Sequence, residues 1–223
     1  MRLDIVSLFP TISQAVLSQS IIGRAQRDGI VDIRHVNLRD YAEDARGTVD
    51  DAILGGGAGM LLKPDIIARC LKSLDAGDAF TVLLCPQGRT FCQPIAANLS
   101  TKEHLILFCG HYEGVDERAR QSFFDLELSL GDFVLTNGVI AAIVVADAVI
   151  RLLPGALGDD ESSVDESFSN ERLLEYPQFT RPAQFQNQDA PNVLLNGNHQ
   201  DIQKWRREQR IIRTAARRPD LLS

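Results

Sequence analysis

The sequence predicts an α/β protein built around a mostly parallel β-sheet. Apolar runs at residues 80–85, 105–109 and 126–130 have the length and composition of buried strands, and each run ends at a Gly or Pro. Segments with helical character alternate with these runs along the chain. This order is typical of parallel strands whose connecting helices cover both faces of a sheet.

The N-terminal part of the chain begins this alternation. Residues 3–9 are predicted to form a strand, after which Pro10 begins a helical stretch that closes at Gly29. Residues 30–38 are predicted to form a second strand. Residues 46–63 surround a cluster of four glycines and are predicted to form a loop. The cluster lacks the Lys-Ser/Thr ending of a Walker loop, which argues against nucleoside triphosphate binding.

The central part of the chain continues the pattern. A helix is predicted over residues 64–74, with Pro at its first position. A turn is predicted at residues 86–88 and a helix over 89–99. A short apolar stretch at residues 133–135, followed by Asn-Gly, suggests a further buried strand. Residues 139–153 are apolar nearly all round, which predicts a helix buried in the core or at a subunit interface.

A polar run divides the chain. Residues 159–175 contain seven acidic residues, one basic residue and four serines, without apolar periodicity. This composition predicts an interdomain linker, of which residues 159–172 are expected to be poorly ordered in the free protein and to become ordered on binding a partner. The predicted parts are a domain at 1–158, a flexible linker at 159–172 and a small helical domain at 173–223.

The C-terminal part is basic. A helix is predicted over residues 199–216, with Ile202, Trp205 and Ile212 on its apolar side and its arginines facing water. Residues 199–223 carry seven basic and three acidic side chains, a net charge of +4, whereas the preceding part carries 16 basic and 27 acidic ones. A basic tail on an acidic body is compatible with local contacts to RNA phosphates or with a solvated helix face.

The remaining composition describes an ordinary soluble protein. The cysteines show no CxxC spacing, so free thiols and no zinc site are predicted. They are Cys70, Cys85, Cys92 and Cys109.

The first ten residues lack the features of a secretory signal, and the longest apolar stretch is too short to span a bilayer. A cytoplasmic protein is expected, without membrane contact.

Polar and glycine-rich loops follow the predicted strands. One begins at Gly110 and carries Glu113, Asp116, Glu117 and Arg118. Loops at strand ends are where α/β proteins bind ligands, and glycines allow the backbone to approach a small molecule closely. The pattern therefore predicts a small-molecule pocket at this edge of the sheet.

The exact amino-acid sequences of these loops are more informative than their pattern of polar and apolar residues. Six blocks, TVDDAILGGGAGMLLKP, CPQGRTFCQ, CGHYEGVDER with SLGDFVLTNG, RLLPGALG, ESFSNERLLEYPQFTRP and LLNGNHQDIQKWR, closely resemble those of bacterial tRNA (guanine-N1)-methyltransferases of the SPOUT superfamily, in the same order. The resemblance implies a deep trefoil knot, a homodimer, S-adenosylmethionine as methyl donor, and methylation of N1 of the guanosine immediately 3′ of the anticodon in tRNA. Arg206 and Arg210 are then candidate phosphate contacts. The family also implies Mg²⁺, although no dedicated ligand cluster is apparent in the sequence, and no metal ligand is predicted.

The resemblance assigns the donor pocket to three loops. The donor-binding residues that it implies are Pro86, Gly110, Glu113, Leu130, Gly131, Asp132, Phe133, Val134, Leu135 and Gly138. Adenine and ribose would contact the backbone of these loops. Glu113 would face the positive end of the donor; its alternative role is an ion pair with Arg118 or another base.

The resemblance also implies two catalytic residues. Glu166 occupies the position of the family's linker acid, often Asp in relatives, and would take the proton from guanine N1. Adjacent Asp165 is the alternative base. Arg151 matches the arginine that would stabilise charge on guanine O6; its alternative role is an ion pair with Asp147, four residues earlier.

Three positions depart from the family pattern. His111 replaces an Arg, Asn137 replaces the first Gly of a Gly-Gly-Glu triplet, and Val139 replaces its Glu. Asn tolerates a left-handed backbone better than most residues, so the turn at Asn137 is expected to survive. Two further readings are a SPOUT methyltransferase with another RNA substrate and an RNA-binding relative without catalysis.

Overall fold

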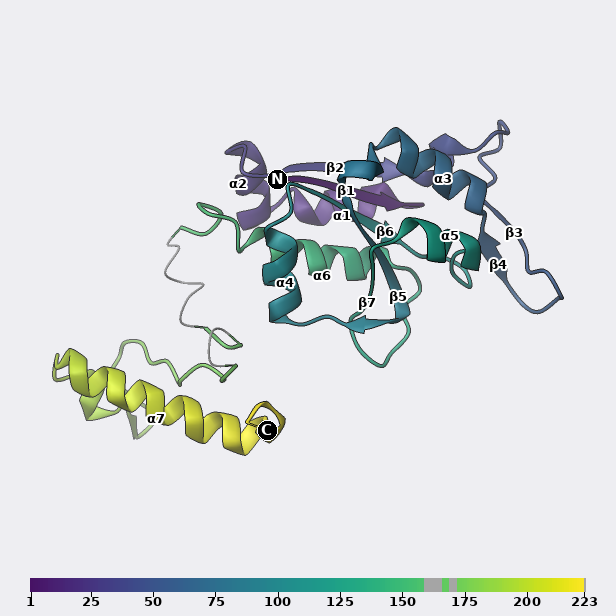
Figure 1. Ribbon diagram of the computed structural model, residues 1–223. Helices are drawn as coiled ribbons and strands as arrows, with labels where there is room; N and C mark the ends of the chain where they lie inside the picture. The colour runs from purple at the N-terminus through teal and green to yellow at the C-terminus, as the bar shows by residue number, and fades with distance from the viewer. Residues whose placement is uncertain (159–165, 169–171, 223) are drawn as a thin grey trace. The chain divides into compact units, whose positions relative to one another are not determined.

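The chain forms two compact units, Met1–Gly158 and Asp159–Ser223 (Figure 1). The computed structural model describes residues 1–158, 166–168 and 172–222. Most of the predicted linker, including the alternative base Asp165, lies outside the described residues, so its predicted ordering on binding stays a prediction.

The first unit contains a five-stranded sheet. Its strands, in spatial order, are β2 (Asp32–Asn37), β1 (Arg2–Ser7), β6 (His104–Cys109), β5 (Phe80–Thr90) and β7 (Leu126–Ser129). All four neighbouring pairs are parallel. The predicted α/β class with a parallel sheet is confirmed.

Helices cover both faces of this sheet. Successive residues of a strand point to opposite faces, so a strand that is apolar throughout presents an apolar surface on each face. Leu105 and Leu107 of β6 belong to one buried cluster, and Ile106 and Phe108 belong to the other. The first cluster is covered by α1 (Pro10–Leu17), α2 (Ser20–Arg27), α4 (Gln93–Ser100) and α6 (Val139–Ile150). The second is covered by α3 (Pro64–Ser73), α5 (Glu117–Phe123) and the 3₁₀ turn η1 (Leu38–Tyr41).

The helical stretch predicted from Pro10 to Gly29 is two helices. The chain turns between α1 and α2, and Ser20 has a φ of 51°. A Cβ on Gly23 would lie 2.1 Å from the carbonyl oxygen of Ser18. Because only glycine permits this approach, the turn is tighter than a continuous helix would allow.

The prediction of a loop over residues 46–63 is wrong in part. This segment contains an antiparallel pair, β3 (Asp50–Ala52) and β4 (Met60–Leu62), which projects from the first unit in Figure 1. The glycine cluster forms the connection between these strands. Its four glycines have positive φ, which lets the chain reverse between very short strands.

The strand suggested at residues 133–135 is also wrong. Phe133, Val134 and Leu135 are 54%, 82% and 38% exposed and lie in an irregular loop. Their neighbour Gly131 has a φ of 151° and its carbonyl accepts a hydrogen bond from the N–H of Phe133. A short apolar run in a tight loop therefore does not require a place in the sheet.

Helix α6 is shorter than the predicted 139–153 and ends at Ile150. Most of its side chains are buried, as predicted. Ile140 and Val144, one turn apart, are instead 45% and 44% exposed. They form an apolar stripe on a helix whose only other exposed residue is Asp147.

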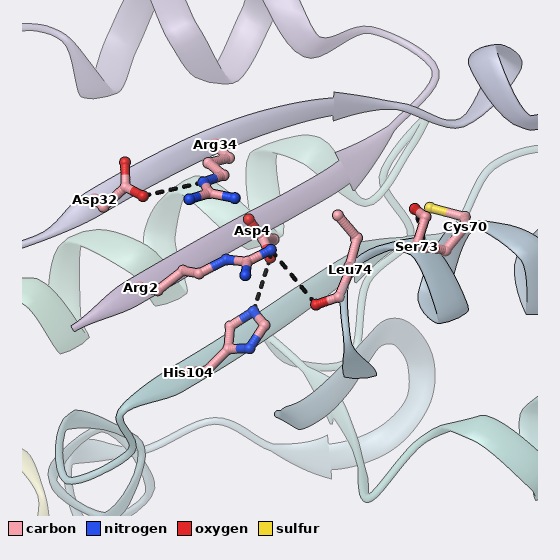
Figure 2. A network of polar contacts seen from close by, with 8 residues as sticks. All are labelled: Arg2, Asp4, Asp32, Arg34, Cys70, Ser73, Leu74 and His104. Atoms are coloured by element: carbon pink, nitrogen blue, oxygen red, sulfur yellow. Dashed lines mark hydrogen bonds and ion pairs between the residues drawn. The ribbon is translucent and has the colours of Figure 1, made fainter. Parts of the chain in front are cut away.

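A polar network anchors the start of the sheet (Figure 2). Asp4 of β1 is fully buried and its Oδ2 lies 2.7 Å from Nη2 of Arg2 and 2.7 Å from Nε2 of His104 on β6. Arg2 also donates to the carbonyl oxygen of Leu74 after α3, at 3.4 Å. A buried carboxylate requires such partners, so this network ties β1, β6 and α3 together. Burial, with a smaller contribution from Asp4, raises the pKa of nearby Cys70 to about 12.

The second unit is organised around α7 (His199–Arg217), close to the predicted helix at 199–216. It also contains a small antiparallel pair, β8 (Gln184–Phe185) and β9 (Gln188–Asp189), and the 3₁₀ turns η4 (Asn192–Leu194) and η5 (Pro219–Leu221). Trp205 packs against Phe179, with ring centroids 6.4 Å apart. Ile212 is 60% exposed, so its predicted place on the packed side is wrong.

Two arginines of α7 occupy the packed side instead. The guanidinium of Arg206 lies over the ring of Tyr176, 4.6 Å from its centroid, and Nη2 of Arg210 donates to the carbonyl oxygen of Glu166 at 3.3 Å. Guanidinium groups suit both contacts because they are planar and carry several donors. The prediction that the arginines face water is therefore wrong for these two.

Across the part of the chain that the structure describes, no helix is both long and apolar enough to cross a membrane. The four cysteines are free thiols, as predicted.

Candidate active site

A cavity of about 260 Å³ opens at the carboxyl ends of β6 and β7, beside residues 83–87 of β5. This is the edge at which parallel sheets place ligand sites. Eight of the ten residues predicted to bind the donor line it: Pro86, Gly110, Glu113, Leu130, Phe133, Val134, Leu135 and Gly138. Gly131 and Asp132 lie in the same loop but do not line the cavity. The predicted loops contribute further lining residues, among them Gln87, His111 and Tyr112, whereas Arg120 lines the cavity from outside these loops and was not predicted.

Glycines bring two of the loops together. The N–H of Gly138, at the start of α6, donates to the carbonyl oxygen of Gly110 after β6, at 2.8 Å. A Cβ on Gly138 would lie 2.8 Å from the nitrogen of Gly110 and 2.9 Å from Cα of Cys109. Any larger residue at 138 would push α6 away from β6, so glycine is required there.

Asn137 supports the same junction, by a route other than the predicted one. Its φ is not positive. Its side-chain Oδ1 instead accepts a hydrogen bond from the N–H of Val139 at 2.9 Å, which satisfies a free donor at the start of α6.

Glu113 lies between the Gly110 loop and the hairpin of β3 and β4. Its N–H donates to the carbonyl oxygen of Met60 at 3.0 Å, and its side chain lies directly against Gly59. The alternative ion pair with Arg118 is wrong. Arg118 binds both carboxylate oxygens of Asp116, at 2.9 and 2.8 Å, and within the described residues Glu113 makes no ion pair.

His111 forms an aromatic part of the lining. Its ring centroid lies 5.4 Å from that of Phe9 and 4.5 Å from that of Tyr112. Burial, and then the positive charge of Arg39, hold the pKa of His111 below its usual value. The pocket therefore holds an imidazole that stays uncharged at neutral pH.

The two predicted catalytic residues belong to different units. Arg151 caps the C-terminus of α6 in the first unit and is half-buried. Its backbone N–H donates to the carbonyl oxygen of Asp147 at 3.1 Å, but the two described side chains form no ion pair with each other. Glu166 lies in the second unit, where its carbonyl oxygen accepts from Arg210.

Among residues 1–158, 166–168 and 172–222, no group of three or more His, Cys, Asp or Glu side chains is arranged to hold a metal ion. No chemical step is therefore assigned to the Mg²⁺ that the resemblance implied.

Comparisons with known proteins place the whole chain in one family. The family model described as "tRNA (Guanine-1)-methyltransferase TrmD" matches residues 1–223. Relatives named tRNA (guanine-N(1)-)-methyltransferase include proteins of Geobacillus kaustophilus, 51% identical, and Carboxydothermus hydrogenoformans, 49% identical. The alignments cover 100% of this chain and 91% and 87% of those proteins, respectively. The chain belongs to the tRNA (guanine-1)-methyltransferase family.

Proposed function

We propose that this protein transfers a methyl group from S-adenosylmethionine to N1 of the guanosine immediately 3′ of the anticodon in tRNA. The observation that carries the proposal is the full-length match to a family of tRNA (guanine-N1)-methyltransferases, together with a cavity where the resemblance puts the donor. The reading as a methyltransferase of another RNA has no comparable support.

The cavity has features suited to the donor. Leu84, Leu130 and Ala141 supply apolar lining for a purine, and the Gly110 and Gly138 loops bring backbone donors and acceptors to its edge. Its volume is near the lower end of the range for small-molecule sites, roughly 300–1,000 Å³. S-adenosylmethionine would supply an electrophilic methyl group on a positively charged sulphur. Glu113 is a carboxylate on the cavity lining and would favour that charge.

The catalytic residues are assigned by position in the family. Guanine N1 must lose its proton to accept a methyl group, and Glu166 would accept that proton. Negative charge then develops on O6, where the Arg151 guanidinium would stabilise it. Asp165 remains the alternative base.

The architecture proposed for this activity has four parts. The first unit binds the donor and contains the trefoil knot; the close contact of Gly138 with Gly110 supports a tightly threaded junction there. The second unit binds tRNA through its basic helix. The protein is cytoplasmic. It forms a homodimer, which the exposed apolar side chains of α1 and α6 support; they are Phe9, Ile12, Val16, Ile140 and Val144.

A methylation assay on tRNA transcripts tests the function. The purified protein should incorporate methyl groups from S-adenosylmethionine into a transcript with guanosine 3′ of the anticodon, and should not methylate one in which that guanosine is replaced. Equal incorporation into both transcripts would indicate another target base. Tight tRNA binding without incorporation would support a non-catalytic RNA-binding relative. A fully active monomer at micromolar concentration would rule out the required dimer.

A further inference from the structure

One wall of the cavity leaves the sheet. Strand β5 pairs with β7 on both sides of a register shift, and Leu84 and Arg89 both lie opposite Leu128. Residues 85–88 therefore bulge out of the ladder, and three of them line the cavity. We call residues 85–88 the wall segment. Because it lies outside the ladder, its conformation depends on other contacts.

Gly88 fixes one end of the wall segment against β7. A Cβ on Gly88 would lie 2.4 Å from the nitrogen of Leu128 and 2.5 Å from the carbonyl carbon of Glu127. The backbone of the wall segment thus lies directly on that of β7. This contact sets where the segment returns to the sheet, but it does not hold the residues that face the cavity.

Arg120 of α5 reaches those residues. Its Nη1 donates to the side-chain oxygen of Gln87, and its Nη2 lies 3.3 Å from the sulphur of Cys85. The Arg120 side chain is only 17% exposed. Arginine has donors but no acceptor, so it also determines which end of the Gln87 amide faces it.

Two carboxylates hold the guanidinium in place. Nε of Arg120 lies 3.3 Å from Glu127 on β7, and Nη1 lies 3.6 Å from Glu117 one turn earlier in α5. Glu127 also accepts from the thiol of Cys85 at 3.2 Å. Burial, and then this hydrogen bond, raise the pKa of Cys85, so the thiol keeps the proton that it donates. Arg120 thus joins the wall segment to both α5 and β7.

We propose that Arg120 is a positioning residue for the methyl donor: it acts through Gln87 and Cys85 to hold the wall segment in the shape that binds S-adenosylmethionine. The proposal rests on the proposed function, since it assumes that this cavity is the donor site. A planar, multidentate group is needed here because one ion must contact the wall segment and Glu127 together, which a lysine ammonium does poorly.

The test measures donor and tRNA dissociation constants separately, by calorimetry with S-adenosylmethionine and by filter binding with tRNA. Arg120→Ala should raise the donor dissociation constant by roughly tenfold, equivalent to about 1.4 kcal/mol. The tRNA dissociation constant should not change, and single-turnover transfer at saturating donor should stay within about threefold of the unaltered rate. Arg120→Lys should give an intermediate donor affinity. The control is Arg118→Ala, because Arg118 lies on the same helix, is 74% exposed and pairs with Asp116.

A double-mutant cycle with Gln87→Met tests the route of action. If Arg120 acts through Gln87, the two substitutions together should weaken donor binding little more than either one alone. The proposal is overturned if the double variant raises the donor dissociation constant by the product of the two single factors. It is also overturned if the donor dissociation constant is unchanged in Arg120→Ala or Arg120→Lys. If Arg120→Ala fails to fold, the Lys variant and Gln87→Met still decide. Failure of the unaltered protein to bind S-adenosylmethionine would instead overturn the proposed function as well.

Discussion

Gly59→Ala should weaken donor binding indirectly, because the added methyl group would displace the side chain of Glu113. A Cβ at position 59 would lie 2.3 Å from Cγ of Glu113 and 2.6 Å from its Oε1. The Glu113 backbone is held by its hydrogen bond to Met60, so the side chain must adopt another rotamer. The hairpin of β3 and β4 thus determines where this carboxylate lies.

The size of the effect can be worked from the contacts. Gly59 has a φ of 89°, where a residue with a Cβ is strained by about 1–2 kcal/mol. Forcing Glu113 from its rotamer adds about 0.5–1.5 kcal/mol. The free energy of unfolding should therefore fall by about 1.5–3.5 kcal/mol. Glu113 is solvent-exposed, so moving it away from a cation about 4 Å distant costs about 1 kcal/mol of binding, or roughly fivefold in the donor dissociation constant.

Gly56→Ala is a matched control. Gly56 lies in the same hairpin with a φ of 85°, and a Cβ there would meet nothing within 4 Å. It should show only the backbone strain, about 1–2 kcal/mol of stability, with an unchanged donor dissociation constant.

Urea unfolding and calorimetry with S-adenosylmethionine measure both quantities. Glu113→Gln should weaken donor binding about as much as Gly59→Ala does. The reasoning is refuted if Glu113→Gln weakens binding while Gly59→Ala and Gly56→Ala bind the donor equally well, since Gly59 then does not control the carboxylate.

Three further predictions concern catalysis, pH and RNA. Glu166→Gln should lower single-turnover transfer by about 10²-fold or more without changing donor affinity; if Asp165→Asn has this effect instead, the base is Asp165. Donor affinity should stay constant as the pH falls to 6.5 and weaken below it. The pKa of His111 is lowered, so its imidazole becomes positively charged only below pH 6.5, and that charge then repels the positively charged donor. Calorimetry on His111→Asn should show no such loss of affinity. Lys204→Ala and Arg217→Ala, both at exposed positions of α7, should each weaken tRNA binding and reduce the slope of log K against log salt by about 1; an unchanged slope would argue against phosphate contacts.

The sheet could be predicted because its signal is local. The central strands β1 and β6 are short runs buried on both faces, and the alternation of Leu105 and Ile106 between two cores requires only the period of a strand. The buried helix at Val139–Ile150 is recognisable for the same reason.

The hairpin and the wall segment could not be predicted in this way. Strands as short as Asp50–Ala52 carry almost no periodic signal, and a glycine cluster is equally compatible with a loop and a turn. The Arg120 cluster joins groups from β5, α5 and β7, and Arg120 lies 35 positions after Cys85 in the sequence. Its chemistry depends on which elements the fold brings together, so the charges of Glu127 and Arg120 look like ordinary surface charges in the sequence.

The arginines of α7 show why charge alone does not locate an RNA contact. Arg206 and Arg210 are as basic as their neighbours, but one covers the Tyr176 ring and the other binds the carbonyl of Glu166. An arginine can pack its aliphatic stem and the face of its guanidinium against protein while its donors satisfy a carbonyl, so a cation on a helix is not necessarily available to a phosphate. Substituting Arg210 would therefore alter the backbone that carries the proposed base, and a loss of activity there would not by itself identify a phosphate contact. The exposed positions, Lys204 and Arg217, separate the two effects, because their side chains can be removed without disturbing the segment that holds Glu166.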